Sequence, residues 1–170
     1  MMKMGNWKKA IAMVFCLVMI LAVAGCGSKE KFTGSNWVSV RKGTSGFENT
    51  VTIYTFEKND KSFTCTRKVT NYMVRSDSLF AIPDYKVEEQ ESEPSKEVGL
   101  VYDEKSNSLT IMGAPRYTYM SKDDTIMEQG NPTPLKKMSK EEIEKAKKDM
   151  QEHAQKQADE RNEQVKRYRY

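Results

Sequence analysis

Histidine is almost absent from this sequence, which holds a single one, His153, among 170 residues. Nucleophilic triads use a histidine as base, and histidine-containing metal sites need further ligands beside it. His153 stands in a strongly charged segment with no evident partner. The scarcity of histidine therefore excludes these two kinds of site, and we interpret His153 as a solvated surface residue.

Other signatures of catalysis are missing as well. The sequence has no glycine-rich loop that would cradle a phosphate and no internal repeat. Asp103, Lys105 and Asn107 have the spacing of the start of a calcium loop, but Lys105 stands where an oxygen ligand is required. Carboxylates are plentiful, yet no two are marked as facing a cleft. We expect no catalytic residue, no metal and no cofactor, and thus a protein that is not an enzyme.

Long hydrophobic runs are confined to the first 25 residues. Lys3, Lys8 and Lys9 give this segment a basic start, and residues 10–24 are uncharged. That run is too short to cross a hydrocarbon core, which needs about 20 residues. The pattern is typical of a signal peptide that is removed, so we expect residues 1–25 to be cleaved.

The end of this run carries four residues with a chemical role. Small side chains at Ala24 and Gly25 let a peptidase hold the backbone extended, and Cys26 offers a thiol for a thioether-linked diacylglycerol. Val23, Ala24, Gly25 and Cys26 resemble the lipobox of bacterial lipoprotein precursors, with Val23 at the position that usually holds Leu. The resemblance implies signal-peptidase recognition at Val23 to Gly25, and lipidation of Cys26 with a diacylglycerol and an N-acyl chain. It also implies a lipid-anchored location on the extracytoplasmic face of the cell membrane, or on the outer membrane in a two-membrane cell.

Net charge and cysteine content limit the mature chain further. Cleavage removes three Lys and no acid, so 28 basic residues fall to 25 against 24 acidic ones. A nearly neutral exported chain lacks the basic face of a nucleic-acid-binding protein, and nucleic acid is excluded as a partner. Cys16 leaves with the signal peptide and Cys26 carries lipid, which leaves Cys65 without an intramolecular disulfide partner. We interpret Cys65 as a small buried hydrophobic residue on a strand.

Residues 32–130 are predicted to form an antiparallel β domain, after a lipidated Cys and short tether at 26–31. Val, Ile, Thr, Tyr and Phe recur there in short alternating runs. The predicted strands are 36–41, 50–57, 62–70, 72–75, 79–83, 97–102, 108–112, 117–120 and 125–128. Polar turns at 58–61, 103–107 and 121–124 predict successive hairpins, and closure into a small barrel would hide the edges of such a meander.

This pattern resembles the small lipocalin-like barrels found behind bacterial lipoprotein leaders. Gly34 and Trp37 stand where a lipocalin carries Gly, any residue, Trp, although here two residues separate them. We interpret Trp37 as a core residue or a plug at the barrel end. Eight strand aromatics could line a ligand cavity or simply fill the core, and we favour the core.

The remaining segments are polar. Residues 84–97 carry six acids and two Lys, and we interpret them as a solvated loop, with a weak cation site as the alternative. Residues 131–138 are predicted to be a linker. Ser139 and Glu142 form a capping box, which starts a charged helix over 139–170. We expect its first half to lie against the barrel and its second half to extend into solvent or fray. The basic, aromatic end of the chain, 166–170, suits anionic headgroups or wall polymers, although a solvated tail is the simpler interpretation.

These features together favour binding over catalysis. We expect a monomeric envelope lipoprotein that acts as a non-catalytic binding or interaction module. Its partners would be the membrane, through the lipid anchor, and another envelope protein or a wall polymer. A lipocalin-like carrier of a small apolar ligand is the alternative, and an envelope hydrolase is a distant third.

Overall fold

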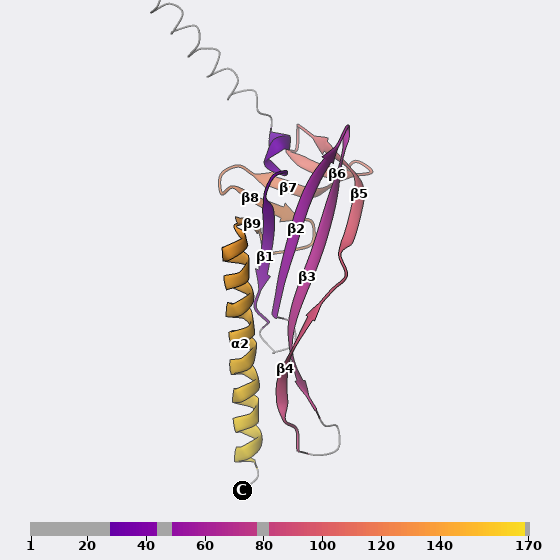
Figure 1. The fold of residues 1–170 in the computed structure, drawn as a ribbon. Helices are drawn as coiled ribbons and strands as arrows, with labels where there is room; N and C mark the ends of the chain where they lie inside the picture. Colours follow the sequence, from indigo (N-terminus) through magenta and orange to yellow (C-terminus); the bar gives the residue numbers. More distant parts are fainter. Residues whose placement is uncertain (1–27, 44–48, 78–81, 169–170) are drawn as a thin grey trace, which may run out of the picture.

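The computed structural model describes residues 28–43, 49–77 and 82–168 (Figure 1). A 3-10 turn, Ser28–Lys31, leads into nine strands and one long helix. In chain order these elements are β1 (Asn36–Arg41), β2 (Asn49–Asn59), β3 (Ser62–Ser76), β4 (Tyr85–Glu91), β5 (Ser95–Asp103), β6 (Ser108–Ile111), β7 (Ala114–Met120), β8 (Thr125–Glu128), β9 (Leu135–Met138) and α2 (Lys140–Arg167). The expected fold class, an antiparallel barrel followed by a long charged helix, is confirmed.

Eight of the nine strands close into the barrel. They follow the order β2-β1-β9-β8-β7-β6-β5-β3, and β3 pairs with β2 to complete the ring. Closure depends on β9, which pairs with both β1 and β8, so the expected linker at 131–138 is wrong. A strand of four residues with two lysines is too short to show an alternating pattern. Leu135 is nevertheless fully buried, while Lys136 and Lys137 are exposed.

β4 lies outside the ring. It pairs with the second half of the long strand β3, which continues beyond the barrel (Figure 1). The first half of β3 pairs with β5, and its second half, from Thr70 to Ser76, pairs with β4. The predicted strands 62–70 and 72–75 are therefore one strand, in which Asn71 pairs with β2 and β4. Residues 78–81 of the predicted strand 79–83 lie outside the described residues, and 82–83 belong to no strand. We call β4, residues 70–76 of β3 and helix α2 together the arm.

The acidic segment 84–97 is not the solvated loop that we expected. It forms β4 and the start of β5, and basic side chains of β3 pair with two of its acids across the strands. Glu88 pairs with Arg75 at 3.2 Å, and Glu91 pairs with Lys68 at 2.7 Å. These cross-strand ion pairs neutralise the repulsion on which the loop interpretation rested.

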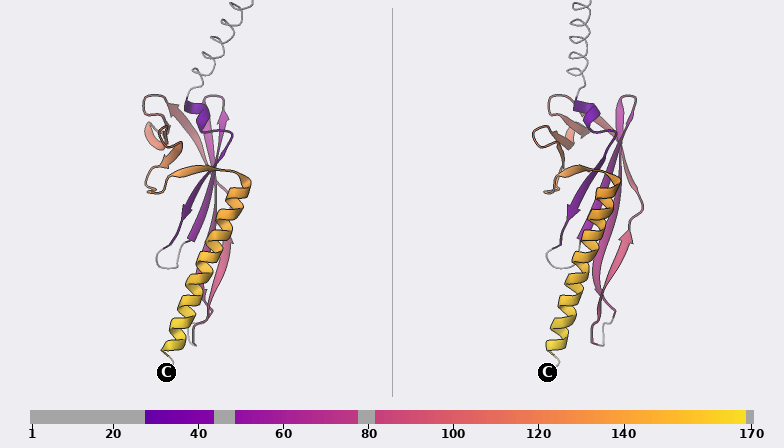
Figure 2. Two further views of the ribbon diagram at one scale, coloured as in Figure 1. Left: turned by 90° about the vertical axis from the view of Figure 1, so that its left-hand side faces the viewer. Right: turned by 60° about the vertical axis from the view of Figure 1, so that its left-hand side comes forward.

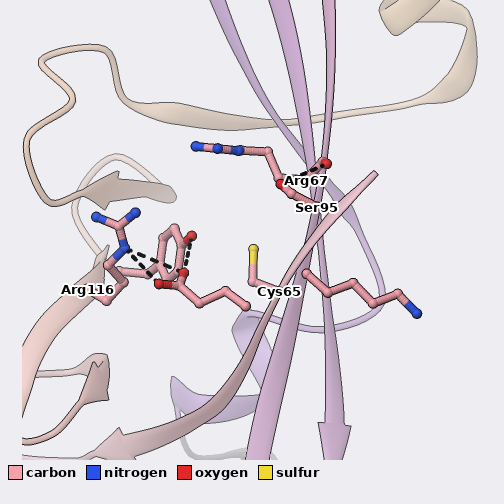
Figure 3. A pocket seen from close by; sticks show the side chains of 7 residues that line it. Cys65, Arg67, Ser95 and Arg116 are labelled. Atoms are coloured by element: carbon pink, nitrogen blue, oxygen red, sulfur yellow. Dashed lines mark hydrogen bonds and ion pairs between the residues drawn. The ribbon is translucent and has the colours of Figure 1, made fainter. Parts of the chain in front are cut away.

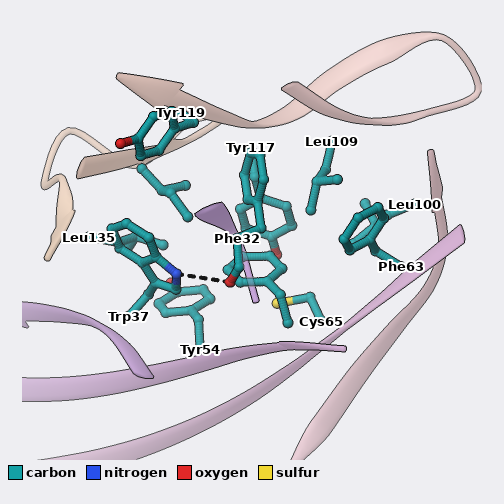
Figure 4. Close-up of a cluster of buried hydrophobic side chains, with 12 residues drawn as sticks. Phe32, Trp37, Tyr54, Phe63, Cys65, Leu100, Leu109, Tyr117, Tyr119 and Leu135 are labelled. Carbon is teal, nitrogen blue, oxygen red and sulfur yellow. Dashed lines mark hydrogen bonds between the residues drawn. The ribbon is translucent and has the colours of Figure 1, made fainter. Parts of the chain in front are cut away.

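The barrel interior is filled with aromatic and aliphatic side chains (Figure 4). Trp37 is fully buried, as expected, and its indole nitrogen donates a hydrogen bond of 3.0 Å to the carbonyl of Phe32. Phe32 follows directly on the 3-10 turn and its ring meets that of Phe56 edge-on, with centroids 5.7 Å apart. The buried members of this core are Phe32, Trp37, Tyr54, Phe56, Phe63, Cys65, Leu100, Leu109, Tyr117, Tyr119, Ile126 and Leu135.

A second core lies between α2 and the outer face of the sheet. Its buried members are Val38, Val51, Tyr72, Val74, Ile143, Met150, Ala154 and Ala158. The strand residues alternate with those of the barrel interior, so Trp37 points inward and Val38 points toward the helix. Small side chains at Ala154 and Ala158 allow close approach of the helix to the strands, and both are fully buried.

The second half of α2 therefore docks, and the expectation that it extends into solvent is wrong. The side chain of Gln157 accepts a hydrogen bond of 2.9 Å from Asn49. One turn later, Asn162 accepts a bond of 2.8 Å from the amide of Tyr85 and donates one of 3.0 Å to its carbonyl. These polar contacts with β2 and β4 hold the helix where its apolar stripe is thin.

The local sequence signals at the helix start and at the turns are confirmed. Ser139 is the N-cap of α2 and forms the expected capping box with Glu142. Asp60, Asn107 and Asp124 adopt positive φ angles of 47°, 51° and 47° in the three predicted polar turns. Asn and Asp tolerate this conformation, which explains why these residues mark the hairpins.

Candidate functional site

The predicted lipidation site cannot be placed in the fold. Val23, Ala24, Gly25 and Cys26 lie outside the described residues. The description begins at Ser28, whose 3-10 turn lies at one end of the molecule, while the C-terminal end of α2 lies at the other (Figures 1 and 2). The chain end nearest Cys26 is thus on the barrel, and the arm points away from it.

Trp37 and Cys65 belong to the same barrel core but His153 lies on α2, so the residues singled out from the sequence form no common site. His153 is half-buried on α2, Trp37 is in the barrel core, and Cys65 is buried at 1% exposure. Burial raises the pKa of the Cys65 thiol to about 11, so this thiol stays protonated at neutral pH. The interpretation of Cys65 as a buried hydrophobic residue is confirmed.

A polar site lies where the inward-facing residues of the sheet change character. On β1 and β2 the core side chains Trp37, Tyr54 and Phe56 point inward. Farther along the same faces, beyond the filled core, stand Ser39 and Thr52 in place of aromatic residues. This end of the barrel is hydroxyl-lined rather than apolar.

Glu128 of β8 is the buried charge at the centre of this site. Its side chain is only 7% exposed. Tyr54 donates a hydrogen bond of 2.7 Å to Oε2, and Asn131 donates one of 3.3 Å to the same oxygen. Arg116 donates to Oε1 at 3.3 Å. The buried carboxylate is thus paired and hydrogen-bonded, as a charge inside a protein must be.

A second carboxylate extends the network to β5. Glu97 accepts hydrogen bonds of 3.1 Å from Nε of Arg116 and 2.7 Å from the hydroxyl of Tyr117. Nη1 of Arg116 also donates to the carbonyl of Gln129 at 3.3 Å. Arg116 therefore bridges Glu97 and Glu128, and its donors are largely committed within the protein.

The tyrosines of this network are held in the protonated state. Burial, then the hydrogen bond to Glu128, raises the pKa of Tyr54 well above its usual value. Burial also raises the pKa of Tyr117, with further contributions from Cys65 and Glu97. Neither tyrosine can act as a base near neutral pH, so the arrangement suits binding and structural support better than proton transfer.

Two adjoining hollows open beside this network and share Arg67 and Arg116. The first has a volume of about 280 Å³ and is lined by Cys65, Arg67, Ser95, Lys96, Glu97, Arg116 and Tyr117 (Figure 3). The second has a volume of about 310 Å³ and is lined by Ser39, Arg41, Thr50, Thr52, Tyr54, Arg67, Arg116, Glu128, Gln129, Gly130, Asn131 and Pro132. We call the two together the mouth pocket. Its lining is polar, with four basic and two acidic residues.

The guanidinium of Arg67 makes fewer contacts with protein groups than that of Arg116 does. Its guanidinium lies 3.9 Å from Oε1 of Glu128, beyond hydrogen-bonding distance, and its side chain is 45% exposed. In Figure 3 the guanidinium groups of Arg67 and Arg116 lie on the same side of the hollow. Arg67 thus presents a cation to the mouth pocket.

No group of three or more His, Cys, Asp or Glu that could hold a metal ion occurs among residues 28–43, 49–77 and 82–168. In those same ranges, no helix is both long enough and apolar enough to cross a membrane. Two acids of 84–97, the segment considered above as a weak cation site, instead form ion pairs with β3 and α2. Glu88 pairs with Arg75, and Glu91 pairs with Lys68 and, at 3.3 Å, with Lys147.

The mouth pocket was missed in the sequence, although a signal for it exists. Phe63, Cys65 and Arg67 alternate along β3, and Ile126 and Glu128 do so on β8. In each series, core residues are followed on the same face by a charged residue, which is Arg67 on β3 and Glu128 on β8. A charge at an inward position of a strand marks either a barrel opening or a buried ion pair, and here it marks both.

Comparisons of this chain with models of known protein families, with characterised proteins and with solved structures found no match. The interpretation of the mouth pocket and the arm therefore depends on their geometry and chemistry alone.

Proposed function

We propose that this protein is a lipid-anchored envelope lipoprotein that acts as a non-catalytic interaction module, with the barrel next to the membrane and the arm presented to a partner. The observation that carries the proposal is that the first and the last described residues, Ser28 and Tyr168, lie at opposite ends of the molecule. The 3-10 turn Ser28–Lys31 adjoins the predicted anchor, whereas α2 ends at the far end of the molecule (Figure 2). A helix of 28 residues is about 42 Å long, so the far end of the arm would stand well clear of the lipid surface.

The far end of the arm has the composition of a contact surface. Ile82, in the segment between β3 and β4, is 52% exposed, and Tyr168 at the end of α2 is 93% exposed. Lys166 and Arg167 precede Tyr168. Exposed aromatic residues beside cations are frequent in protein interfaces and also suit anionic polymers. We therefore place the partner contact at this end, as either an envelope protein or a wall polymer.

A carrier of a small apolar ligand is the less favoured alternative. The residues that would line its cavity, among them Phe56, Tyr117 and Leu109, contact one another in the barrel core. The mouth pocket has a polar lining, which does not suit an apolar ligand. A hydrolase is less favoured still, because the carboxylates Glu97 and Glu128 are engaged by Arg116 and by tyrosine hydroxyls.

The partner contact can be tested by site-specific photo-crosslinking in cells. A photoreactive amino acid replaces Tyr168 at the far end of the arm or, as the matched control, Asp60 in the exposed β2–β3 turn at the barrel end. We expect a discrete crosslinked species from position 168 that is lost when Lys166 and Arg167 are both replaced by Gln. A crosslink from position 60 alone would place the partner at the barrel and overturn the proposal.

The anchor is tested separately. Replacement of Cys26 with Ala should abolish incorporation of labelled fatty acid and leave unprocessed precursor, whereas Ser28→Ala should have no effect. Continued lipid incorporation in the Cys26→Ala variant would contradict the anchor while leaving the partner contact untouched.

A further inference from the structure

We infer that the mouth pocket binds a small hydroxylated anion, such as an acidic or phosphorylated sugar, with Arg67 as the residue that binds the charged group. This inference is independent of the arm and of its partner. It depends on the excess of basic residues in the pocket lining, on the available donors of the Arg67 guanidinium, and on the hydroxyl groups and the size of the pocket.

The charge of the mouth pocket favours an anion. Arg41, Arg67, Lys96 and Arg116 stand against two carboxylates, which leaves an excess of two positive charges in the lining. Both carboxylates accept hydrogen bonds from Arg116 and from a tyrosine hydroxyl. The network therefore holds its own acids in place and leaves basic groups available for a ligand.

Arg67 is the best placed of these basic groups. Its backbone is fixed in the middle of β3, between β2 and β5, where it pairs with Tyr54 and Ser95. Across the ranges that the structure describes, its guanidinium makes one ion contact, the 3.9 Å approach to Glu128. A planar guanidinium with unused donors matches the two oxygens of a carboxylate or phosphate.

The remaining lining matches hydroxyl groups. Ser39, Thr50 and Thr52 of β1 and β2 and Ser95 of β5 line the hollows. These groups both donate and accept hydrogen bonds. The hollows of about 280 Å³ and 310 Å³ are at the small end of ligand sites, which limits the ligand to one or two sugar-sized rings.

Calorimetric titration of the full-length protein in detergent solution tests this inference. The probes are glucuronate and glucose 6-phosphate, with glucose as the neutral control. We expect saturable binding of at least one anionic probe and none of glucose. Preference for glucuronate would identify a carboxylate ligand, and preference for glucose 6-phosphate a phosphate ligand. No saturable heat from either anion at millimolar concentration would overturn the inference.

Variants separate a built site from general attraction to cations. Arg67→Gln should weaken binding about tenfold or more, because a charge-assisted hydrogen bond is lost. Arg67→Lys should recover only part of the affinity, since it keeps the charge but not the planar fork. The matched control is Arg75→Gln on the arm, where Arg75 is similarly exposed and pairs with Glu88, and its affinity should be unchanged. Equal weakening by Arg67→Gln and Arg75→Gln would overturn the inference. If Arg67→Gln fails to fold, Arg41→Gln, at the exposed end of β1 and in the lining of one hollow, takes its place, and it should weaken binding by a smaller factor than is expected for Arg67→Gln.

Discussion

The hydroxyl of Tyr54 on β2 donates a hydrogen bond of 2.7 Å to the carboxylate of Glu128 on β8, two strands that are not neighbours in the sheet. The bond therefore crosses the barrel at the level where the aromatic core ends and the mouth pocket begins. It connects opposite walls, which strand pairing alone does not do. Burial of both partners makes the bond a strong one.

Removal of this hydroxyl should destabilise the protein. Tyr54→Phe deletes the donor and leaves a buried carboxylate oxygen with one weaker bond from Asn131, so we expect the free energy of unfolding to fall by about 2 kcal/mol. Urea denaturation measures the change. The control is Tyr102→Phe, which removes a half-buried bond of 3.0 Å to the neutral side chain of Asn107 and should cost less. An equal or larger loss in the control would contradict the special role of Glu128.

The part of the fold that could be predicted is the part where short runs of β-forming residues stand between turn residues. Strands such as β1 and β8 agree with their predicted bounds for this reason, although β1 is buried on both faces at Trp37 and Val38. β9 was missed because Leu135 is buried only once β9 lies between β8 and the distant strand β1. β4 was missed because clustered acids do not predict a strand, whereas pairing with β3 brings Glu88 to Arg75 and Glu91 to Lys68.

The inward charges of the mouth pocket have a signal in the sequence, but the way in which they pair could not be predicted. Glu97 and Glu128 belong to β5 and β8, and nothing in their local sequence shows that Arg116 of β7 bridges them. A single chain reveals which residues face inward, but the distance between two inward charges depends on barrel closure. Closure in turn depends on β9, which the sequence did not indicate.

Cys65 should be inert toward thiol reagents in the folded protein. It is the only cysteine beyond residue 26, its side chain is 1% exposed, and burial raises its pKa to about 11. We expect slow labelling by a chromogenic disulfide at neutral pH and fast labelling once urea unfolds the chain. A Ser121→Cys variant, at an exposed turn position, provides the fast native control. Rapid labelling of Cys65 under native conditions would show that the mouth pocket opens deeply into the core.

Stability should decrease in alkali because buried tyrosines keep their protons. Burial raises the pKa of Tyr72 and of Tyr119 to about 12, against 10.0 for a free tyrosine. Below about pH 10 both the folded and unfolded chains hold these protons, and stability is unaffected. Between about pH 10 and 12 the unfolded chain loses them first, so the free energy of unfolding falls by roughly 1.4 kcal/mol per pH unit and tyrosine.

Urea titrations at several pH values, with tyrosinate absorbance as a second readout, measure this decrease. Tyr72→Phe should make the pH dependence shallower, because one of the contributing groups is gone. Full ionisation of all tyrosines near pH 10 in a chain that stays folded would contradict the prediction.

The β6–β7 turn offers a stabilising substitution. Met112 has a φ of 49° and Gly113 one of 79° between the paired residues Ile111 and Ala114, and the Met112 side chain is fully exposed. Asn favours this left-handed conformation and no packing is lost, so Met112→Asn should raise the free energy of unfolding by about 1 kcal/mol. Met112→Val should lower it, because a β-branched residue resists a positive φ. The same stability for both variants would show that the turn relaxes.

The docking of α2 on the sheet can be tested at Ala158. Ala158 is fully buried against the sheet in the second half of the helix. Ala158→Glu would bury an unpaired carboxylate, which we expect to lower the free energy of unfolding by about 3 kcal/mol or more. Gln151→Glu, on the exposed face of α2, adds the same charge and should change stability by less than about 0.5 kcal/mol. If the two variants unfold at the same urea concentration, the second half of α2 does not pack on the sheet. A partner would then meet a free helix instead of a docked one.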